Sequence, residues 1–263
     1  MKLDFTRSFA DALAAWRRDG ALLLPVAGLT MFLPQLAILL LVPSPSSLMP
    51  DQADMVLEGG KPDPATVQAT ADALTGWATQ YGGWYALAPA LALFGALAVM
   101  ALYLMPQRPT VAGALGRAAV LFLRYLLASI LIGFAALSIL LPGAMSGLLL
   151  AALMPLAFYV LGRTMLVAPV IVGEAPVGAI AAIQRSWQLT RGNGWMLGAT
   201  YAAPLFAAQL IGGALLSIGE MGGANPVIAG IVDGLAALVL TIATLLLALV
   251  EIALYRRLAS TGT

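Results

Sequence analysis

The sequence predicts an all-α polytopic membrane protein with about six transmembrane helices, arranged as three hairpins that are each preceded by an interfacial amphipathic helix. The first observation is composition: 61% of the 263 residues are hydrophobic and only 10% are charged, against roughly 45–50% and 25% in an average soluble domain. The second is that several uninterrupted apolar stretches reach the roughly 20 residues that a helix needs to cross a membrane. The third is the sorting of basic residues to one side of these stretches. Residues 1–263 are therefore expected to form a single integral-membrane domain.

Six apolar stretches between charged residues are the predicted spans. The third and fourth are separated only by residues 142–147, whose proline and two glycines do not readily continue a helix, so we expect a tight hairpin there. The segment before the first span carries acids as well as bases, and no A-x-A cleavage pattern follows, so we expect that span to be retained rather than cleaved as a signal peptide. The spans are 21–42, 84–105, 118–141, 147–172, 195–219 and 226–255.

Basic residues separate cleanly between the two sides of these spans. The side facing away from the termini carries only Lys61, in a segment with five acidic residues. Because short cytoplasmic segments of membrane proteins are enriched in Lys and Arg, both termini are predicted to be cytoplasmic. The basic residues on the terminal side are Lys2, Arg7, Arg17, Arg18, Arg108, Arg117, Arg185, Arg191, Arg256 and Arg257.

The segment 43–83 is predicted to be an extracytoplasmic loop. Its first part is rich in Pro and Ser and has no apolar period, so it is expected to be irregular. Asp63 and Pro64 suit the N-cap and first position of a helix. Apolar residues then recur every three or four positions, which predicts a short amphipathic helix on the outer face. This loop is either a solvated cap over the spans or a lid for a substrate or partner.

The segment 173–195 combines a helical period of apolar residues with an opposite polar face. Residues 4–18 and, more weakly, 111–117 show the same pattern directly before a predicted hairpin. Such helices lie in the headgroup plane of a membrane, with Trp187 of the third expected to point toward the acyl chains. The residues assigned to this third interfacial helix are Ile180, Ile183, Arg185, Trp187 and Arg191.

The carboxy-terminal half resembles a family of bacterial integral-membrane proteins of uncharacterised function. The similar segments are LPG at 141–143, LVAPVIVGE at 166–174, AIQRSWQLTRGN at 182–193 and YRR at 255–257. That family is related to the membrane domain of some glycerophosphodiester phosphodiesterases, and the resemblance implies a six-helix module of the bacterial inner membrane. The hydrolytic domain of the fused relatives uses histidines and carboxylates around a metal, whereas this chain contains no histidine. We therefore expect no phosphodiesterase activity.

The absence of cysteine and histidine excludes most familiar active sites. Thiolate and imidazole metal ligands, cysteine nucleophiles and Ser-His-Asp triads are all missing. We therefore expect no enzyme, no cofactor and no metal, and the lack of a basic tract argues against nucleic acid. The leading hypothesis is an inner-membrane module that acts through lipids, a membrane-protein partner or a second copy of itself. The alternative is a small secondary transporter or lipid flippase.

Charged residues inside the predicted spans are the candidate functional residues, because they are costly in a bilayer. Arg163 is expected nearest the midplane, and Glu251 is the carboxylate expected to neutralise it. Arg124 competes for the same carboxylate, so Arg124, Arg163 and Glu251 form a candidate polar cluster. This cluster either locks helices together or lines a polar cavity that opens to the cytoplasm.

Overall fold

The computed structural model describes residues 5–44, 64–106, 109–221 and 225–260, and within these ranges the chain is helical without a strand. Six helical segments are long and apolar enough to cross a membrane. The predicted all-α, multi-pass architecture is thereby confirmed. The elements are α1 (Phe5–Ala27), the π-helix η1 (Gly28–Phe32), α2 (Leu33–Leu41), α4 (Pro64–Leu104), α5 (Val111–Leu140), the 3₁₀-helix η3 (Leu141–Met145), α6 (Gly147–Thr164), α7 (Val167–Gly173), α8 (Ala179–Leu189), α9 (Gly194–Met221) and α10 (Pro226–Ser260).

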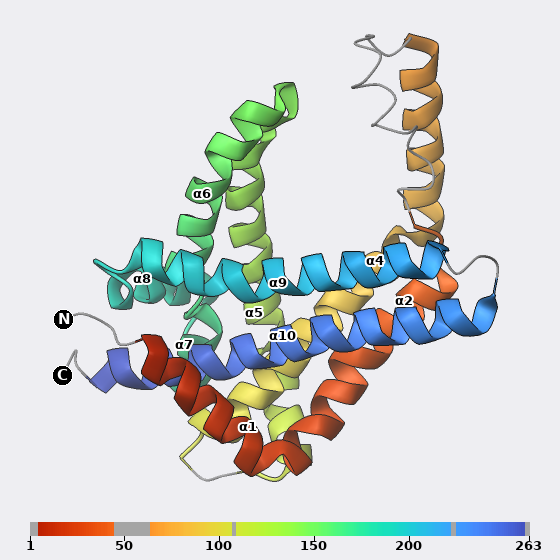
Figure 1. Cartoon of the computed structure of the whole chain (residues 1–263). Coiled ribbons are helices and arrows are strands. Elements are labelled where there is room, and N and C mark those ends of the chain that lie inside the picture. Colours follow the sequence, from red (N-terminus) through yellow and green to blue (C-terminus); the bar gives the residue numbers. More distant parts are fainter. Residues whose placement is uncertain (1–4, 45–63, 107–108, 222–224, 261–263) are drawn as a thin grey trace.

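The long helices form three hairpins that diverge from one another (Figure 1). The first consists of α1, η1 and α2 with α4, the second of α5 with α6, and the third of α9 with α10. The start of α1 and the end of α10 lie side by side, with α8 nearby. We call this end of the molecule the terminal end. The turn of the α5–α6 hairpin points well away from the far ends of α9 and α10, so the hairpins share contacts mainly toward the terminal end.

Among the described residues, only the third hairpin is preceded by a separate helix. In the first, residues 5–18 continue directly into the span as α1, which kinks at Asp19 (φ −112°, ψ 15°). In the second, residues 111–117 are the first turns of α5, whose N-terminus is capped by the Thr110 side chain accepting from the Gly113 N–H at 3.2 Å. α8 stands alone because Gly192, with φ +84°, ends it before α9 begins.

The helix predicted within the 43–83 loop is the beginning of α4 and not a separate element. α4 is 41 residues long, about 60 Å at 1.5 Å per residue, and so extends well beyond the roughly 30 Å of a hydrocarbon layer. Trp77 on this extension donates from Nε1 to the Pro43 carbonyl at 2.9 Å and packs its ring 4.8 Å from that of Tyr85. The start of the long helix is thereby fastened to the end of α2. The predicted irregular stretch at 45–63 lies outside the described residues.

Two spans are interrupted helices. The first changes to a π-helical turn at η1, where the Leu33 N–H bonds the Gly28 carbonyl and the next residue, Pro34, has no N–H to donate. At this turn α4 approaches so closely that a side chain on Gly95 would begin 2.0 Å from Oγ1 of Thr30. The fourth predicted span breaks after Thr164 into α6 and α7.

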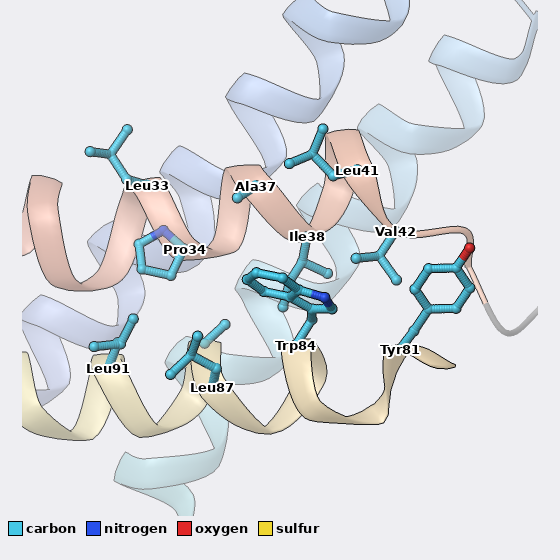
Figure 2. Close-up of a pocket in the computed structure, with 11 residues that line it drawn as sticks. Leu33, Pro34, Ala37, Ile38, Leu41, Val42, Tyr81, Trp84, Leu87 and Leu91 are labelled. Carbon is cyan, nitrogen blue, oxygen red and sulfur yellow. The ribbon is translucent and has the colours of Figure 1, made fainter. Parts of the chain in front are cut away.

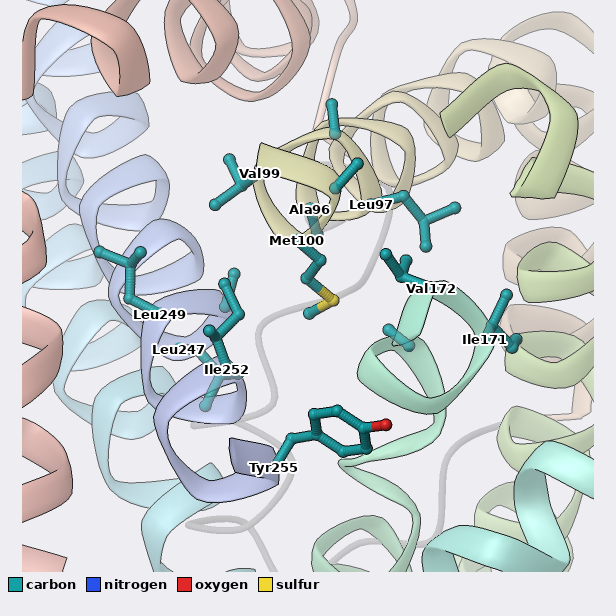
Figure 3. Close-up of a cluster of buried hydrophobic side chains, with 14 of the residues drawn as sticks. Ala96, Leu97, Val99, Met100, Ile171, Val172, Leu247, Leu249, Ile252 and Tyr255 are labelled. Atoms are coloured by element: carbon teal, nitrogen blue, oxygen red, sulfur yellow. The ribbon is translucent and has the colours of Figure 1, made fainter. Parts of the chain in front are cut away.

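The apolar core surrounds α7. Six consecutive residues of this short helix, from Val167 to Val172, are buried. Figure 3 shows α7 facing Leu97 and Met100 of α4, with the ring of Tyr255 of α10 pointing toward it. Because α7 belongs to the chain between the second and third hairpins, its burial joins those hairpins to the first.

Candidate functional site

Arg163 is buried at the end of α6 and points at the end of α8. Its side chain donates from Nη1 to the Thr190 carbonyl at 2.9 Å and from Nη2 to the Trp187 carbonyl at 2.7 Å. The guanidinium carbon lies 4.7 Å from the centre of the Trp187 ring, in cation–π contact. The last carbonyls of a helix lack intrahelical partners and carry partial negative charge. The carboxy-terminal end of α8 therefore compensates the charge of Arg163.

The two helix ends satisfy each other reciprocally. The Arg163 carbonyl accepts from Oγ of Ser186 at 2.8 Å and from Oγ1 of Thr190 at 3.2 Å. Beside these ends, glycines let α9 cross α6 closely, because a Cβ on Gly162 of α6 would begin 2.1 Å from the Gly198 nitrogen of α9. We call Arg163, Ser186, Trp187 and Thr190 the α6–α8 clasp. Three residues of the RSWQLT stretch, Ser186, Trp187 and Thr190, therefore have a structural role in this clasp.

The predicted ion pair between Arg163 and Glu251 is wrong. Arg163 reaches backbone carbonyls because the helix break after Thr164 sets α8 beside its side chain, an arrangement that span depth alone does not reveal. Glu251 is 7% exposed and forms neither a hydrogen bond nor an ion pair with any other described residue. Its carboxylate lies within electrostatic range of the phenols of Tyr125 and Tyr201. Arg124 is exposed on α5, so the three predicted residues do not form one cluster.

The residues of α8 that are buried against the protein lie outside the predicted apolar stripe, which was expected to face the acyl chains. These buried residues are Ala179, Ala182 and Ser186. Trp187 is half-buried against Arg163 and the ring of Tyr159, whose centroid is 6.4 Å away. Its orientation toward acyl chains stays a prediction. The clasp holds this tryptophan by both its carbonyl and its ring, which a helical period does not reveal.

The remaining residues assigned to that helix have separate roles. Ile183 packs partly against the core, whereas Ile180 is 64% exposed and Arg191 is exposed. Arg185 forms an ion pair with Glu174 at 3.2 Å, and Glu174 also accepts from the Tyr255 hydroxyl at 3.4 Å. Through Glu174, these contacts connect the end of α7 to both α8 and α10.

A second set of arginines surrounds a cavity of about 290 Å³ at the terminal end, between α1, α4 and α10. We call this cavity the basic pocket. Three of the residues around it are arginines, and apolar residues of α1 and α10 supply much of the remaining wall. Its lining consists of Asp11, Ala14, Ala15, Arg18, Tyr103, Leu249, Ile252, Ala253, Arg256 and Arg257.

The basic pocket is held in shape by contacts between the three helices. Arg257 of α10 forms an ion pair with Asp11 of α1, and Arg256 donates to the carbonyl of Tyr103 on α4. The Tyr103 hydroxyl in turn donates to Asp19 at 2.8 Å, next to the α1 kink.

The arginines of the basic pocket remain accessible. The side chain of Arg18 is 59% exposed and that of Arg257 is 29% exposed, although each contacts an aspartate. Arg256 is also exposed, with its guanidinium carbon 6.0 Å from the centre of the Tyr103 ring. Arg18 pairs with Asp19 and Arg257 with Asp11, whereas Arg256 bonds the Tyr103 carbonyl, which leaves a positive excess at this cavity.

The chemistry of the basic pocket suits a phosphate group. Guanidinium groups present several N–H donors in a fixed plane that matches phosphate oxygens. Within the described part of the chain, no group of three or more acidic, histidine or cysteine side chains is placed to hold a metal ion. The chain matches no protein-family model, no curated protein and no solved structure.

Sequence reasoning identified the arginines of the basic pocket only as orientation signals. Arg18 and Arg256 come from opposite ends of the chain, and no periodic pattern relates them. The available signal was that both termini carry paired basic residues on one side of the membrane, at 17–18 and 256–257.

Proposed function

We propose that this protein is a non-enzymatic module of the bacterial inner membrane, which binds the headgroup of an anionic phospholipid in the basic pocket. The observation that carries the proposal is the cavity between α1, α4 and α10, with Arg18, Arg256 and Arg257 around it. A lipid in this place would contact three helices from two hairpins. Its binding would therefore stabilise their association.

The expected cytoplasmic position of the basic pocket favours an anionic ligand. Basic residues concentrate at the terminal end, so the positive-inside rule favours cytoplasmic termini and a cytoplasmic position for the basic pocket. The cytoplasmic leaflet carries negative surface potential, and basic pockets between helices at this level are suited to anionic headgroups. The resemblance in the carboxy-terminal half is compatible with this location, but the proposal does not depend on it.

The residues that line the basic pocket favour a lipid over a free anion as its ligand. Arg18 and Arg256 offer donors to a phosphate, while Ala14 and Ala253 offer apolar surface of the kind that covers the glycerol backbone and first methylenes of a lipid. At about 290 Å³ the cavity is near the lower limit of small-molecule sites. It therefore fits a headgroup better than a whole lipid. A membrane-protein partner or a second copy remains part of the proposal as a further ligand of the module.

Native mass spectrometry of the detergent-purified protein tests this function. The protein is mixed with equal amounts of phosphatidylglycerol and phosphatidylethanolamine carrying identical acyl chains, so that only headgroup charge differs. We expect retained phosphatidylglycerol to exceed retained phosphatidylethanolamine, because guanidinium–phosphate contacts are strengthened where the headgroup has no compensating amine. The double substitution Arg18→Gln and Arg256→Gln should abolish this preference.

The matched control is the double substitution Arg124→Gln and Arg191→Gln, which removes the same charge from exposed arginines outside the basic pocket. It should keep the preference for phosphatidylglycerol. Equal retention of both lipids by the unaltered protein would contradict the proposal. An equal loss of preference in both double variants would show that net charge, and not the basic pocket, selects the lipid.

Glu251 supports a second candidate function, a small secondary transporter or lipid flippase. A carboxylate that is 7% exposed and unpaired among the described residues is costly inside a membrane protein, and such residues are frequent in ion and proton pathways. Proteoliposomes with a fluorescent phospholipid test the flippase form. Lipid exchange between leaflets should exceed that of protein-free vesicles and be lost in Glu251→Gln. Exchange at the protein-free rate would reject it.

A further inference from the structure

The far half of the first hairpin contains a groove of about 430 Å³ between α2 and α4. We call it the apolar groove. Figure 2 shows side chains from both helices converging on it, with Ile38 and Trp84 facing each other across its middle. It is lined by Leu33, Pro34, Ala37, Ile38, Leu41, Val42, Tyr81, Trp84, Leu87, Ala88 and Leu91.

The polarity of the apolar groove changes along its length. Tyr81 and Val42 lie at the end nearest the α2 terminus, and the hydroxyl of Tyr81 points away from the aliphatic residues (Figure 2). The opposite end, deeper in the span, is formed by Leu33, Pro34 and Leu91. Tyrosine and tryptophan concentrate at the boundary between hydrocarbon and headgroups. The groove therefore runs from an interfacial end to a hydrocarbon end.

The length of the apolar groove matches one leaflet. The distance along α4 from Tyr81 to Leu91 is ten residues, or about 15 Å of helix, which is half of the roughly 30 Å hydrocarbon thickness. On the other wall, Leu33 to Val42 covers a similar distance. This leaflet is the one farther from the terminal end, because the basic pocket touches the same α4 helix at Tyr103, near its other end.

From these features we propose that the apolar groove binds one acyl chain of a phospholipid from the leaflet opposite the basic pocket. The chain lies between α2 and α4 with its ester end at Tyr81 and its methyl end at Leu33 and Leu91. A chain of this kind is thin, flexible and wholly apolar, as the lining requires. The site is separate from the headgroup site proposed above and does not depend on it.

A transmembrane helix from another protein or from a second copy fits the apolar groove less well. Such a helix is about 10 Å or more in diameter and crosses both leaflets, whereas the groove has a volume of only about 430 Å³ and covers one leaflet. Helix–helix contacts in membranes are also enriched in small residues that let backbones approach. The lining of the groove is instead dominated by Leu, Ile, Trp and Tyr side chains.

Photocrosslinking in nanodiscs tests the acyl-chain site. The protein is placed in a bilayer doped with a phosphatidylcholine that carries a diazirine halfway along one acyl chain. After illumination, the excess lipid is removed in detergent and adducts are mapped by peptide mass spectrometry. We expect adducts to concentrate on the segments 33–42 and 81–91, well above those on α9, whose Leu210 is 73% exposed and does not line the apolar groove.

The substitution Ala37→Phe, which places a ring inside the apolar groove, should remove the excess adducts from both segments. The control Ala151→Phe adds the same ring on the exposed surface of α6 and should leave the adduct pattern unchanged. Circular dichroism and gel-filtration profiles identify any variant that fails to fold, and Ala37→Leu provides a smaller filling side chain in that event. Adducts spread in proportion to exposure, or an excess that survives groove filling, would overturn the proposal. Crosslinks to a second copy at these segments would identify a protein occupant instead and overturn it as well.

Discussion

The α6–α8 clasp and the basic pocket use arginine in opposite ways. In the clasp, Arg163 is 8% exposed and donates to two backbone carbonyls that its own chain provides. In the basic pocket, Arg18, Arg256 and Arg257 keep exposed surface around a cavity.

This difference separates structural from ligand-binding cations in the same protein. Arg163 is expected to lie deeper in the membrane than the arginines of the basic pocket, so its charge costs more free energy to bury. By that criterion alone it would be the stronger functional candidate. Its contacts show the contrary, because both terminal nitrogens of its guanidinium donate to carbonyls at the end of α8. The shallower arginines carry the binding hypothesis. Four substitutions, taken from the largest expected effect to the smallest, test this contrast.

The most damaging change should be Gly162→Ala. Its new methyl group would begin 2.1 Å from the Gly198 nitrogen, so α6 and α9 must separate and the clasp must loosen. We expect a loss of about 3 kcal/mol or more, in the range of overpacked interiors, seen as a lower Tm in detergent. The control Gly133→Ala, on α5 with open space around the site, should leave Tm nearly unchanged. Similar Tm values for the two variants would disprove the close crossing.

Arg163→Gln should be the next most severe. It leaves the Trp187 and Thr190 carbonyls without their charged donor, at an expected cost of about 2–3 kcal/mol. Because Glu251 does not contact Arg163, the loss from Arg163→Gln combined with Glu251→Gln should equal the sum of the single losses within about 0.5 kcal/mol. Chemical unfolding in mixed micelles measures the cycle. A coupling free energy well above about 0.5 kcal/mol would show that Arg163 and Glu251 interact, which would contradict the structure.

Thr190→Val tests the reciprocal half of the clasp. Valine keeps the shape but loses the hydroxyl that donates to the Arg163 and Ser186 carbonyls, so we expect a cost of about 1 kcal/mol. Thr241→Val is the comparison, because its hydroxyl bonds only the Ala237 carbonyl within its own helix. If both variants lost the same stability in the same unfolding assay, the contact between helices would contribute nothing beyond local bonding.

Arg257→Gln should have the smallest effect on folding. Its ion pair with Asp11 lies at a partly exposed surface, where such pairs contribute about 0–1 kcal/mol. The difference in Tm between Arg257→Gln and the unaltered protein should be smaller still in 0.5 M salt, because salt screens exposed charges. A loss as large as that of Arg163→Gln would mean that the basic pocket is structural after all.

Hydropathy and charge were sufficient to predict the six spans, because an apolar stretch of sufficient length has few alternatives to a transmembrane helix. They did not predict that residues 64–104 form one helix, since Gly82 and Gly83 lower helix propensity without breaking a helix that is otherwise favourable. They also missed the break after Thr164. Pro169 has no N–H to bond the Met165 carbonyl, which favours a break at this point. The hydroxyls of Ser186 and Thr190, which the sequence pattern did not place there, bond the Arg163 carbonyl at the end of α6.

The candidate site was less predictable than the spans. Depth along a helix gives no information about which side of it a residue faces, so Arg124, Arg163 and Glu251 were grouped although the fold directs them to different surroundings. The basic pocket joins residues from α1 and α10 at opposite ends of the sequence. Only the arrangement of the hairpins brings these residues together.

The effect of lipid on stability tests the central claim most directly. Adding phosphatidylglycerol at about a hundred times its dissociation constant should raise the Tm of the unaltered protein by about 5 °C or more, because a ligand that binds only the folded state stabilises it. Phosphatidylethanolamine should give a smaller rise. In Arg18→Gln with Arg256→Gln the two lipids should have equal effects, whereas Arg163→Gln, although less stable, should keep the full difference between them. If Arg163→Gln abolished the difference and the double variant kept it, the assignment of structural and ligand-binding arginines would be reversed.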